Sequence, residues 1–256
     1  MTLIKSLIIA FGTYSRVPMP TVKIDKNQDR FTLAFFPIVG LFIAALCWAL
    51  LYLCHRISSP DEVRVCGLIL IPLAVTGGIH MDGFMDCMDA LSSYKSKEEK
   101  LVILSDPHIG AFSVIKVIEI VAVYIIACVF INYVYWGLLP VGFIIARALS
   151  GFSVMTFDLA KDTGMCAYTR GRAAKSCGLI CLVEFIVVAF VTIFLYGYGA
   201  VPAVALCLFC LLYYKYKSKK DFGGITGDTA GCFLVMTELA WVVGVSLYCF
   251  VEWIVL

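Results

Sequence analysis

Residues 32–54 read TLAFFPIVGLFIAALCWALLYLC and contain no charged side chain. A helix needs about 20 mostly apolar residues to cross the hydrocarbon core of a bilayer, so this stretch predicts a membrane-spanning helix. Six further apolar stretches follow along the chain, at approximately 64–81, 112–131, 136–157, 178–196, 199–214 and 230–254. The sequence therefore predicts an all-α fold, a polytopic membrane bundle of about seven transmembrane helices.

The overall composition agrees with this prediction. The chain has 256 residues, of which 62% are hydrophobic and only 15% are charged, whereas a soluble domain carries about 25% charge. We expect a single integral-membrane domain over residues 1–256. Residues 1–14 are apolar but short, so they predict a helix that either lies on the membrane surface or inserts partly. A net charge of +2 without a basic stripe gives no indication of a nucleic-acid partner.

The basic residues are concentrated in alternate connecting segments. Sixteen of the twenty lysines and arginines lie in segments 1–31, 82–111, 158–177 and 215–229. The intervening loops carry only Arg56 and Arg64. Because positive charge favours the cytoplasmic side, the N-terminus and these four segments are predicted to be cytoplasmic, and the C-terminus is predicted to lie on the opposite side.

The most informative polar motif follows the second apolar stretch, where residues 77–89 read GGIHMDGFMDCMD. On a helix, Asp82, Asp86 and Asp89 lie within about 60° of one another, because each residue turns about 100°. Clustered carboxylates repel one another unless a cation neutralises them. Their hard oxygen atoms suit Mg²⁺ or Mn²⁺. The motif therefore predicts a divalent-metal site held by these three aspartates in an enzyme that handles phosphates.

Glycine-rich segments surround this acidic motif. Gly77 and Gly78 precede it and are expected to let the backbone approach a substrate closely. Before the last apolar stretch, Gly224, Thr226 and Gly227 belong to a loop whose backbone N–H groups, together with the following helix N-terminus, are suited to a phosphate.

Three further polar residues each have two interpretations. Asp228 would either cap the last helix or complete the metal site. Asp106, in the segment Ser105-Asp106-Pro107-His108, would either form a turn before a helix or contact the substrate. Arg147 lies within an apolar stretch, where a charge costs at least about 2.5 kcal/mol. It would therefore pair with an acid of the pocket, or bind a substrate phosphate.

With these segments in view, the chain resembles the cobalamin synthase family, also called adenosylcobinamide-GDP ribazoletransferases. Two of the matching segments are specific, and the order and spacing of all of them along nearly the whole chain strengthen the resemblance. The segments are Arg16-Val17-Pro18-Met19-Pro20, Phe36-Pro37-Ile38-Val39-Gly40, Gly77 through Asp89, Asp106-Pro107-x-Ile109-Gly110, Gly223 through Gly231, and Glu238-Leu239. The specific ones are Gly77 through Asp89 and Gly223 through Gly231. The chain departs from the family at two positions, with His108 in place of an arginine and Ser113 in place of a glycine, and this leaves the role of position 108 open.

The resemblance implies an enzyme of the bacterial inner membrane that acts late in cobalamin biosynthesis. Such an enzyme joins adenosylcobinamide-GDP to α-ribazole or α-ribazole 5′-phosphate, releases GMP and uses Mg²⁺. Its partners are then these small molecules and the lipid bilayer. The oligomeric state is left open, with a homo-oligomer included.

A mechanism follows from the acidic motif together with this resemblance. Asp82, Asp86 and Asp89 would hold one or two Mg²⁺ ions on the diphosphate. The acceptor hydroxyl would attack the phosphoryl group attached to cobinamide. The assisting base would be His80, Asp89 or Asp228. His80 has a second interpretation, in which it only orients an aspartate.

Two other functions compete with this one. A CDP-alcohol phosphotransferase that makes a phospholipid would need a different signature, in which an Asp-x-x-Asp-Gly motif is followed by Ala-Arg and two further spaced aspartates. A cation-coupled transporter would place its acids at the middle of the bilayer, whereas here they cluster at the end of a predicted span.

Overall fold

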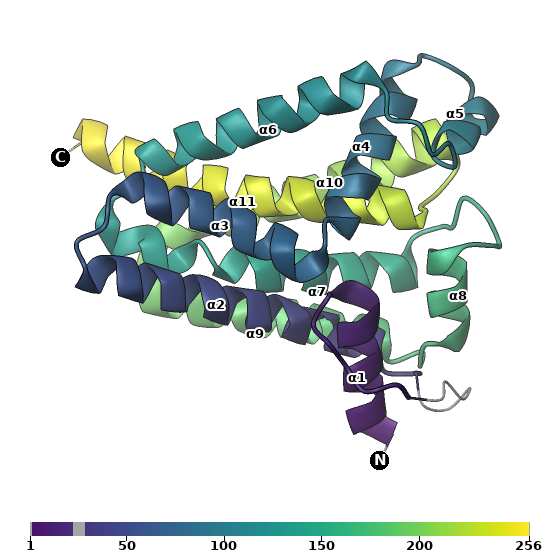
Figure 1. Ribbon diagram of the computed structural model, residues 1–256, viewed down its shortest axis with the longest axis horizontal. Coiled ribbons are helices and arrows are strands. Elements are labelled where there is room, and N and C mark those ends of the chain that lie inside the picture. Colours follow the sequence, from purple (N-terminus) through teal and green to yellow (C-terminus); the bar gives the residue numbers. More distant parts are fainter. Residues whose placement is uncertain (1, 23–28, 256) are drawn as a thin grey trace.

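Helices account for nearly all of the secondary structure in the computed structural model, which describes residues 2–22 and 29–255 (Figure 1). No strand forms within these ranges, where a single parallel bridge joins Leu159 to Ile225. The elements in chain order are α1 (Thr2–Tyr14), η1 (Leu33–Phe35), α2 (Phe36–Arg56), α3 (Asp61–Thr76), α4 (Ile79–Ser92), α5 (Lys97–Ile103), α6 (Ala111–Val129), η2 (Tyr133–Leu138), α7 (Val141–Thr156), α8 (Met165–Arg172), α9 (Cys177–Tyr196), η3 (Gly197–Ala200), α10 (Val201–Phe222) and α11 (Gly227–Val255).

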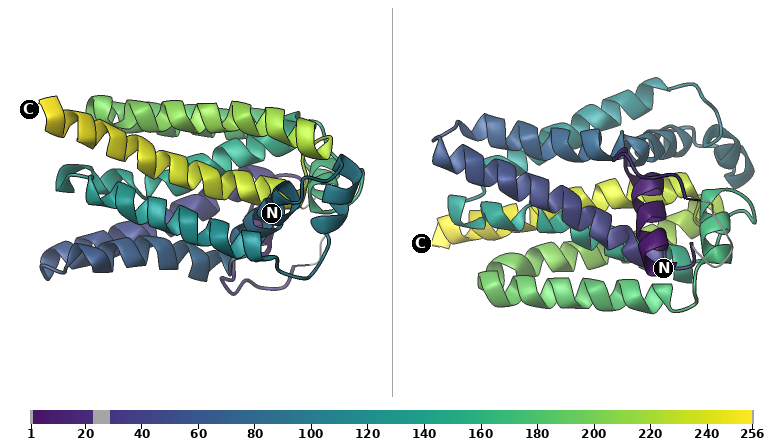
Figure 2. Two further views of the ribbon diagram at one scale, coloured as in Figure 1. Left: turned by 90° about the horizontal axis from the view of Figure 1, so that it is seen from above. Right: turned by 60° about the horizontal axis from the view of Figure 1, so that its bottom comes forward.

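The long apolar helices run side by side and form a membrane bundle (Figures 1 and 2). Five stretches within the described residues are long and apolar enough to cross a membrane, and the bent pair of α3 and α4 would make a sixth. One of the five, Cys177–Phe222, contains both α9 and α10. Its two ends pack beside the same part of the chain, because Gly178 lies against Met155 while Lys219 binds Asp158. The stretch therefore doubles back, and each of the seven predicted stretches corresponds to a helix.

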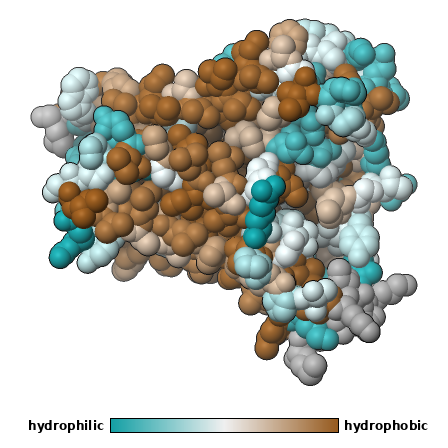
Figure 3. Space-filling model, in the orientation of Figure 1, coloured by the Kyte–Doolittle hydropathy of each residue, from teal (hydrophilic) through white to brown (hydrophobic). Residues whose placement is uncertain are grey.

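The bundle surface shows the pattern of a membrane protein. In Figure 3, hydrophobic residues cover the middle of the visible face, and hydrophilic residues gather toward its two ends. Many large apolar side chains of α6 and α9 are exposed, among them Ile126, Phe190 and Phe194. Lipid can cover such side chains, so their exposure agrees with the predicted membrane location.

The predicted span 64–81 is wrong at its C-terminal end. The helix α3 ends at Thr76, and α4 leaves it at an angle of 96°. The bend forms because Gly77 and Gly78 have φ angles of +66° and +82°, a left-handed conformation that glycine adopts readily. A Cβ at Gly77 would also collide with the Arg16 side chain. The acidic motif therefore lies on a helix of its own, which bends away from α3 at one end of the bundle.

Both the N-terminus and the short helices gather at this end of the bundle, and the C-terminus lies at the other end (Figure 1). The helix α1, predicted as interfacial or partly inserted, lies across the start of α2 and packs Tyr14 against Phe36 at 4.2 Å between ring centroids. The short helices α5 and α8 were not predicted. Lys23 and Lys26, two of the basic residues in segment 1–31, lie outside the described residues.

Candidate active site at one end of the bundle

Two glycines let α4 cross α11 closely. A Cβ on Gly83 would lie 2.9 Å from both the Cα and the carbonyl oxygen of Asp228. A Cβ on Gly231 would lie 3.3 Å from the carbonyl oxygen of His80. Larger residues would push the helices apart. Because Asp82 begins the acidic motif on α4 and Asp228 lies in the first turn of α11, this crossing brings carboxylates from distant parts of the sequence together.

The other carboxylates are close enough to Asp86 to change its ionisation. The pKa of Asp86 rises from its ordinary value of 3.8 to about 6. Partial burial is the largest cause, and the negative charges of Asp82, Asp228 and Asp89 add to it in that order. The structure thus brings the three predicted aspartates of α4 together and adds Asp228 to the group.

We expect Asp86→Asn to stabilise the metal-free protein at neutral and alkaline pH. A raised folded-state pKa means that the protonated form of Asp86 stabilises the fold. This contribution is complete below about pH 4 and is lost as the pH rises through about 6. Thermal unfolding of the detergent-solubilised protein with a chelator should therefore show no difference between variant and wild type at pH 4 and a higher midpoint for the variant at pH 8. An equal difference at both pH values would contradict this origin of the effect.

Within the described residues, no three histidine, cysteine, aspartate or glutamate side chains are placed to hold a metal ion by themselves. Mg²⁺ does not require such a cage, because it is usually bound by one or two carboxylates together with waters and substrate phosphates. One or two of the carboxylates of Asp82, Asp86 and Asp228 would suffice for such an ion, with waters and substrate phosphate oxygens as its other ligands.

Asp89 makes hydrogen bonds to the start of α6 that cannot be predicted from its position in the sequence. Its carboxylate accepts hydrogen bonds from the backbone N–H groups of Gly110 at 2.7 Å and Ser113 at 2.9 Å. Ser113 Oγ donates in turn to the Gly110 carbonyl at 2.6 Å. A carboxylate at a helix N-terminus is stabilising, so Asp89 fastens α4 to the start of α6. Its roles as metal ligand and base stay predictions.

The loop before α6 contains Asp106 and His108. Asp106 Oδ1 accepts a hydrogen bond from the His108 backbone N–H at 3.0 Å and contacts its Nδ1 at 2.6 Å. The backbone hydrogen bond and then the imidazole contact lower the pKa of Asp106. The turn interpretation of Asp106 is therefore the one that the structure shows, and His108 helps to close the turn. A substrate contact by Asp106 stays a prediction.

The glycine-rich loop is capped by threonines. The Thr229 backbone N–H donates to Thr226 Oγ1 at 3.2 Å, and the Thr226 backbone N–H donates to Thr229 Oγ1 at 2.8 Å. These reciprocal bonds satisfy the start of α11. The Asp228 carboxylate, which accepts a hydrogen bond from Thr226 Oγ1 at 3.5 Å, is therefore not needed as the cap.

The same loop is fastened to the segment that follows α7. The Ile225 backbone N–H donates to the Asp158 carbonyl at 2.8 Å, and the Ala160 N–H donates to the Ile225 carbonyl at 3.0 Å. Gly224 packs so tightly against Leu159 that no Cβ would fit. Gly224 therefore has a structural role in the packing of this loop. Contacts of Gly224 and Gly227 with a phosphate stay predictions.

Two adjoining cavities meet at Asp228. One encloses about 280 Å³ and is lined by polar groups that include Lys161, Thr163 and Thr226. The other encloses about 240 Å³ and is mostly apolar, with Asp82 and His80 at its edge. Met165, Cys166, Gly227 and Asp228 line both. The first therefore suits an anionic group and the second suits an apolar one, with the carboxylates beside them.

Sequence reasoning missed several residues of the second cavity. They are Tyr14 of α1, Ser150 and Val154 of α7, and Met165 and Thr169 of α8. In the sequence each is an ordinary apolar or hydroxyl residue without any motif spacing. Only their positions on helices that meet at this end of the bundle distinguish them.

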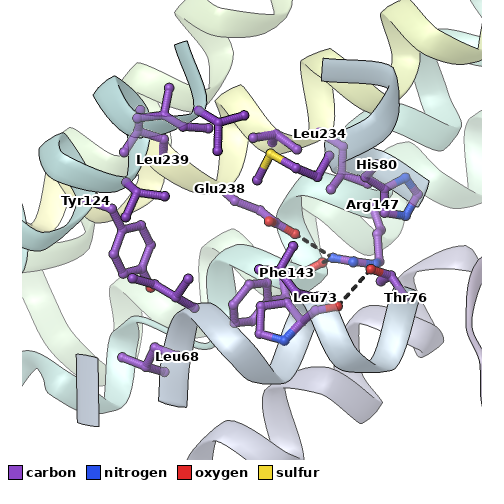
Figure 4. Close-up of a pocket in the computed structure, with 17 residues that line it drawn as sticks. Leu68, Leu73, Thr76, His80, Tyr124, Phe143, Arg147, Leu234, Glu238 and Leu239 are labelled. Carbon is purple, nitrogen blue, oxygen red and sulfur yellow. Dashed lines mark hydrogen bonds and ion pairs between the residues drawn. The ribbon is translucent and has the colours of Figure 1, made fainter. Parts of the chain in front are cut away.

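Arg147 pairs within the bundle, as one of its two interpretations predicted. Its Nη1 lies 2.9 Å from Glu238 Oε1 and donates to the Phe143 carbonyl at 2.9 Å, and the side chain is only 1% exposed (Figure 4). The pair borders a third cavity of about 150 Å³ that also contains His80 and Tyr124. His80 Nε2 is buried and has no hydrogen-bond partner within the structure. A substrate contact by Arg147 stays a prediction.

Comparison with known proteins places these features in a family. The model of the family described as cobalamin-5-phosphate synthase matches residues 6–246. A protein of Lachnoclostridium phytofermentans named adenosylcobinamide-GDP ribazoletransferase is 35% identical over 93% of this chain and 92% of its own length. Proteins with the same name from Clostridium botulinum and Clostridium perfringens are 32% and 29% identical, over 93% and 91% of this chain and 95% and 94% of their own lengths. No solved structure matches the chain.

Proposed function

The chain belongs to the cobalamin-5-phosphate synthase family, and we propose that it is a Mg²⁺-dependent adenosylcobinamide-GDP ribazoletransferase. It joins adenosylcobinamide-GDP to α-ribazole, or to α-ribazole 5′-phosphate, and yields adenosylcobalamin, or its 5′-phosphate, and GMP. The structural observation that supports this reaction is the meeting of Asp82, Asp86 and Asp228 beside a polar and an apolar cavity. A diphosphate donor and a nucleoside acceptor need neighbouring sites of these two kinds.

The metal would be held by carboxylates of both helices. Asp82 and Asp86 of α4 and Asp228 of α11 supply the oxygen donors, and Asp89 positions α6 and the preceding loop. A Mg²⁺ ion held by these residues would supply positive charge to offset the negative charge of the diphosphate and of the departing GMP. Lys161, at the polar cavity, supplies a positive charge for the same phosphates.

The protein groups then act on the acceptor. A bond forms between the acceptor hydroxyl oxygen and the phosphorus attached to cobinamide, and the bond from that phosphorus to the GMP oxygen breaks. The hydroxyl proton passes to a base. Asp228 is the first candidate, since it lies between the two cavities. His80 lines the cavity of Asp82, but burial and the positive charge of Arg147 lower its pKa to about 3, so its imidazole is a weaker base and the second candidate.

The distribution of basic residues supports a proposal for the side of the membrane that the site faces. The active-site end of the bundle carries the basic segments that begin or end α5, α8 and α10. On the positive-inside rule we propose that this end faces the cytoplasm, where nucleotide substrates are available. The membrane proposed is the inner membrane of a bacterial cell.

The direct test is the release of GMP by the purified full-length protein in detergent. With adenosylcobinamide-GDP and α-ribazole, we expect GMP and a cobalamin product in equal amounts. Addition of EDTA should stop the reaction, and excess Mg²⁺ should restore it. Undiminished GMP release in EDTA would refute the metal requirement, and the absence of a cobalamin product would refute the transferase activity.

A further inference from the structure

The mostly apolar cavity beside Asp82 has a wall of aromatic side chains. The Tyr14 and Phe36 rings lie 4.2 Å apart at an angle of 36°, and the Phe36 and His80 rings lie 5.8 Å apart. These three side chains come from α1, α2 and α4 and line one cavity. Met165 of α8 also lines this cavity, and a thioether packs well against aromatic rings.

We propose that this cavity binds the flat heteroaromatic base of the ribazole acceptor, with Tyr14 as a stacking residue. The proposal rests on the proposed function and assigns a place to one of its two substrates. Aromatic side chains bind bases by stacking, which tolerates different bases because each has a π-face. A base seated here would hold its ribose near Asp82 and Asp228, which line the same cavity.

The neighbouring cavities fit the acceptor base less well. The polar cavity has Lys161 and Thr226 in its lining, which suit the phosphates of the donor. The cavity in Figure 4 encloses only about 150 Å³ and contains none of the four clustered aspartates. A base bound there would lie beside the Arg147–Glu238 pair, in a cavity that none of the clustered aspartates lines.

The cavity also has hydroxyl groups at its border. Ser150 of α7 is 3% exposed, and Thr169 of α8 is half-buried. A heteroaromatic ring nitrogen needs a hydrogen-bond partner when it leaves water, and either hydroxyl can donate one. An apolar wall with one or two polar groups is the usual composition of a small-molecule site.

The test compares Tyr14→Leu with Tyr14→Phe, because only the second variant keeps the ring. Both are measured as purified full-length proteins in detergent, with matched thermal unfolding as a check of folding. We expect Tyr14→Leu to raise the KM for α-ribazole about tenfold, to leave the KM for adenosylcobinamide-GDP unchanged, and to weaken the binding of α-ribazole alone in calorimetry by the same factor. Tyr14→Phe should keep both values within about twofold of wild type.

The matched control is Tyr124→Leu, which makes the same change in the cavity of Figure 4. It should leave the KM and the binding of α-ribazole unchanged. The proposal is overturned if Tyr124→Leu weakens α-ribazole binding while Tyr14→Leu does not, or if Tyr14→Leu changes only kcat or the KM of the donor. Failure of the wild-type protein to release GMP would instead refute the proposed function, and the inference with it.

Discussion

Asp82→Ala should abolish GMP release while leaving the protein folded and inserted in the membrane. Asp82 is an exposed residue of α4 at the cavity that also contains Asp228. Loss of a metal-binding carboxylate removes transition-state stabilisation of about 4 kcal/mol, which corresponds to a fall in kcat of about 1,000-fold. GMP formation by membranes that contain equal amounts of variant and wild type measures this effect.

Asp162→Ala is the matched control for this substitution. It removes the same charge at the same end of the bundle, from an exposed loop residue that lines neither active-site cavity. We expect its activity to stay within about twofold of wild type, because its exposed side chain is not part of either cavity lining and exposed substitutions have small effects. Full activity of Asp82→Ala, or an equal loss in both variants, would show that the acidic motif is not the metal site.

Arg147→Met should have the largest effect on stability. Arg147 is 1% exposed and bound to Glu238, whose side chain is 17% exposed. Removing one partner of a buried ion pair costs about 3–5 kcal/mol, because the other charge stays without compensation. The unfolding free energy of the detergent-solubilised protein, from denaturant titration, should fall by this amount.

The double variant with Arg147→Met and Glu238→Leu distinguishes two causes of the lost stability. One is the charge left on Glu238, and the other is the loss of packing around Arg147. Replacing both charged partners with apolar residues of similar size is often neutral or stabilising. The double variant should therefore be more stable than Arg147→Met alone and close to wild type. A double variant as unstable as the single one would mean that the loss of stability comes from the packing of Arg147 against Phe36 rather than from the charge left on Glu238.

The membrane fold was predictable because it depends on a property of single segments. Each of the seven apolar stretches corresponds to a helix, since a long segment without charge buries its backbone polar groups only in a helix. The helix α5 also has a sequence signal, the Ser96 and Glu99 capping box, which apolar patterning ignores. The bend at Gly77 and Gly78 was missed because two adjacent glycines permit a reversal of backbone direction without requiring it.

The candidate site was predictable only where its residues share a segment. The spacing of Asp82 and Asp86 places them on one helix face whatever the rest of the chain does. Asp228 is 142 positions beyond Asp86, and its proximity depends on the crossing at Gly83 and Gly231. The same limit applies to Asp89, whose bonds to the start of α6 depend on the path of the intervening loop.

The sequence by itself determined that this protein is a helical membrane protein with an acidic motif suited to a divalent cation, because hydrophobicity and helical spacing act over a few neighbouring residues. Only the tertiary structure decided which carboxylates meet, that Thr226 rather than Asp228 caps α11, and that Tyr14 and Met165 enclose a cavity beside them. These features depend on contacts between distant segments, whose geometry follows from the packing of all the helices together.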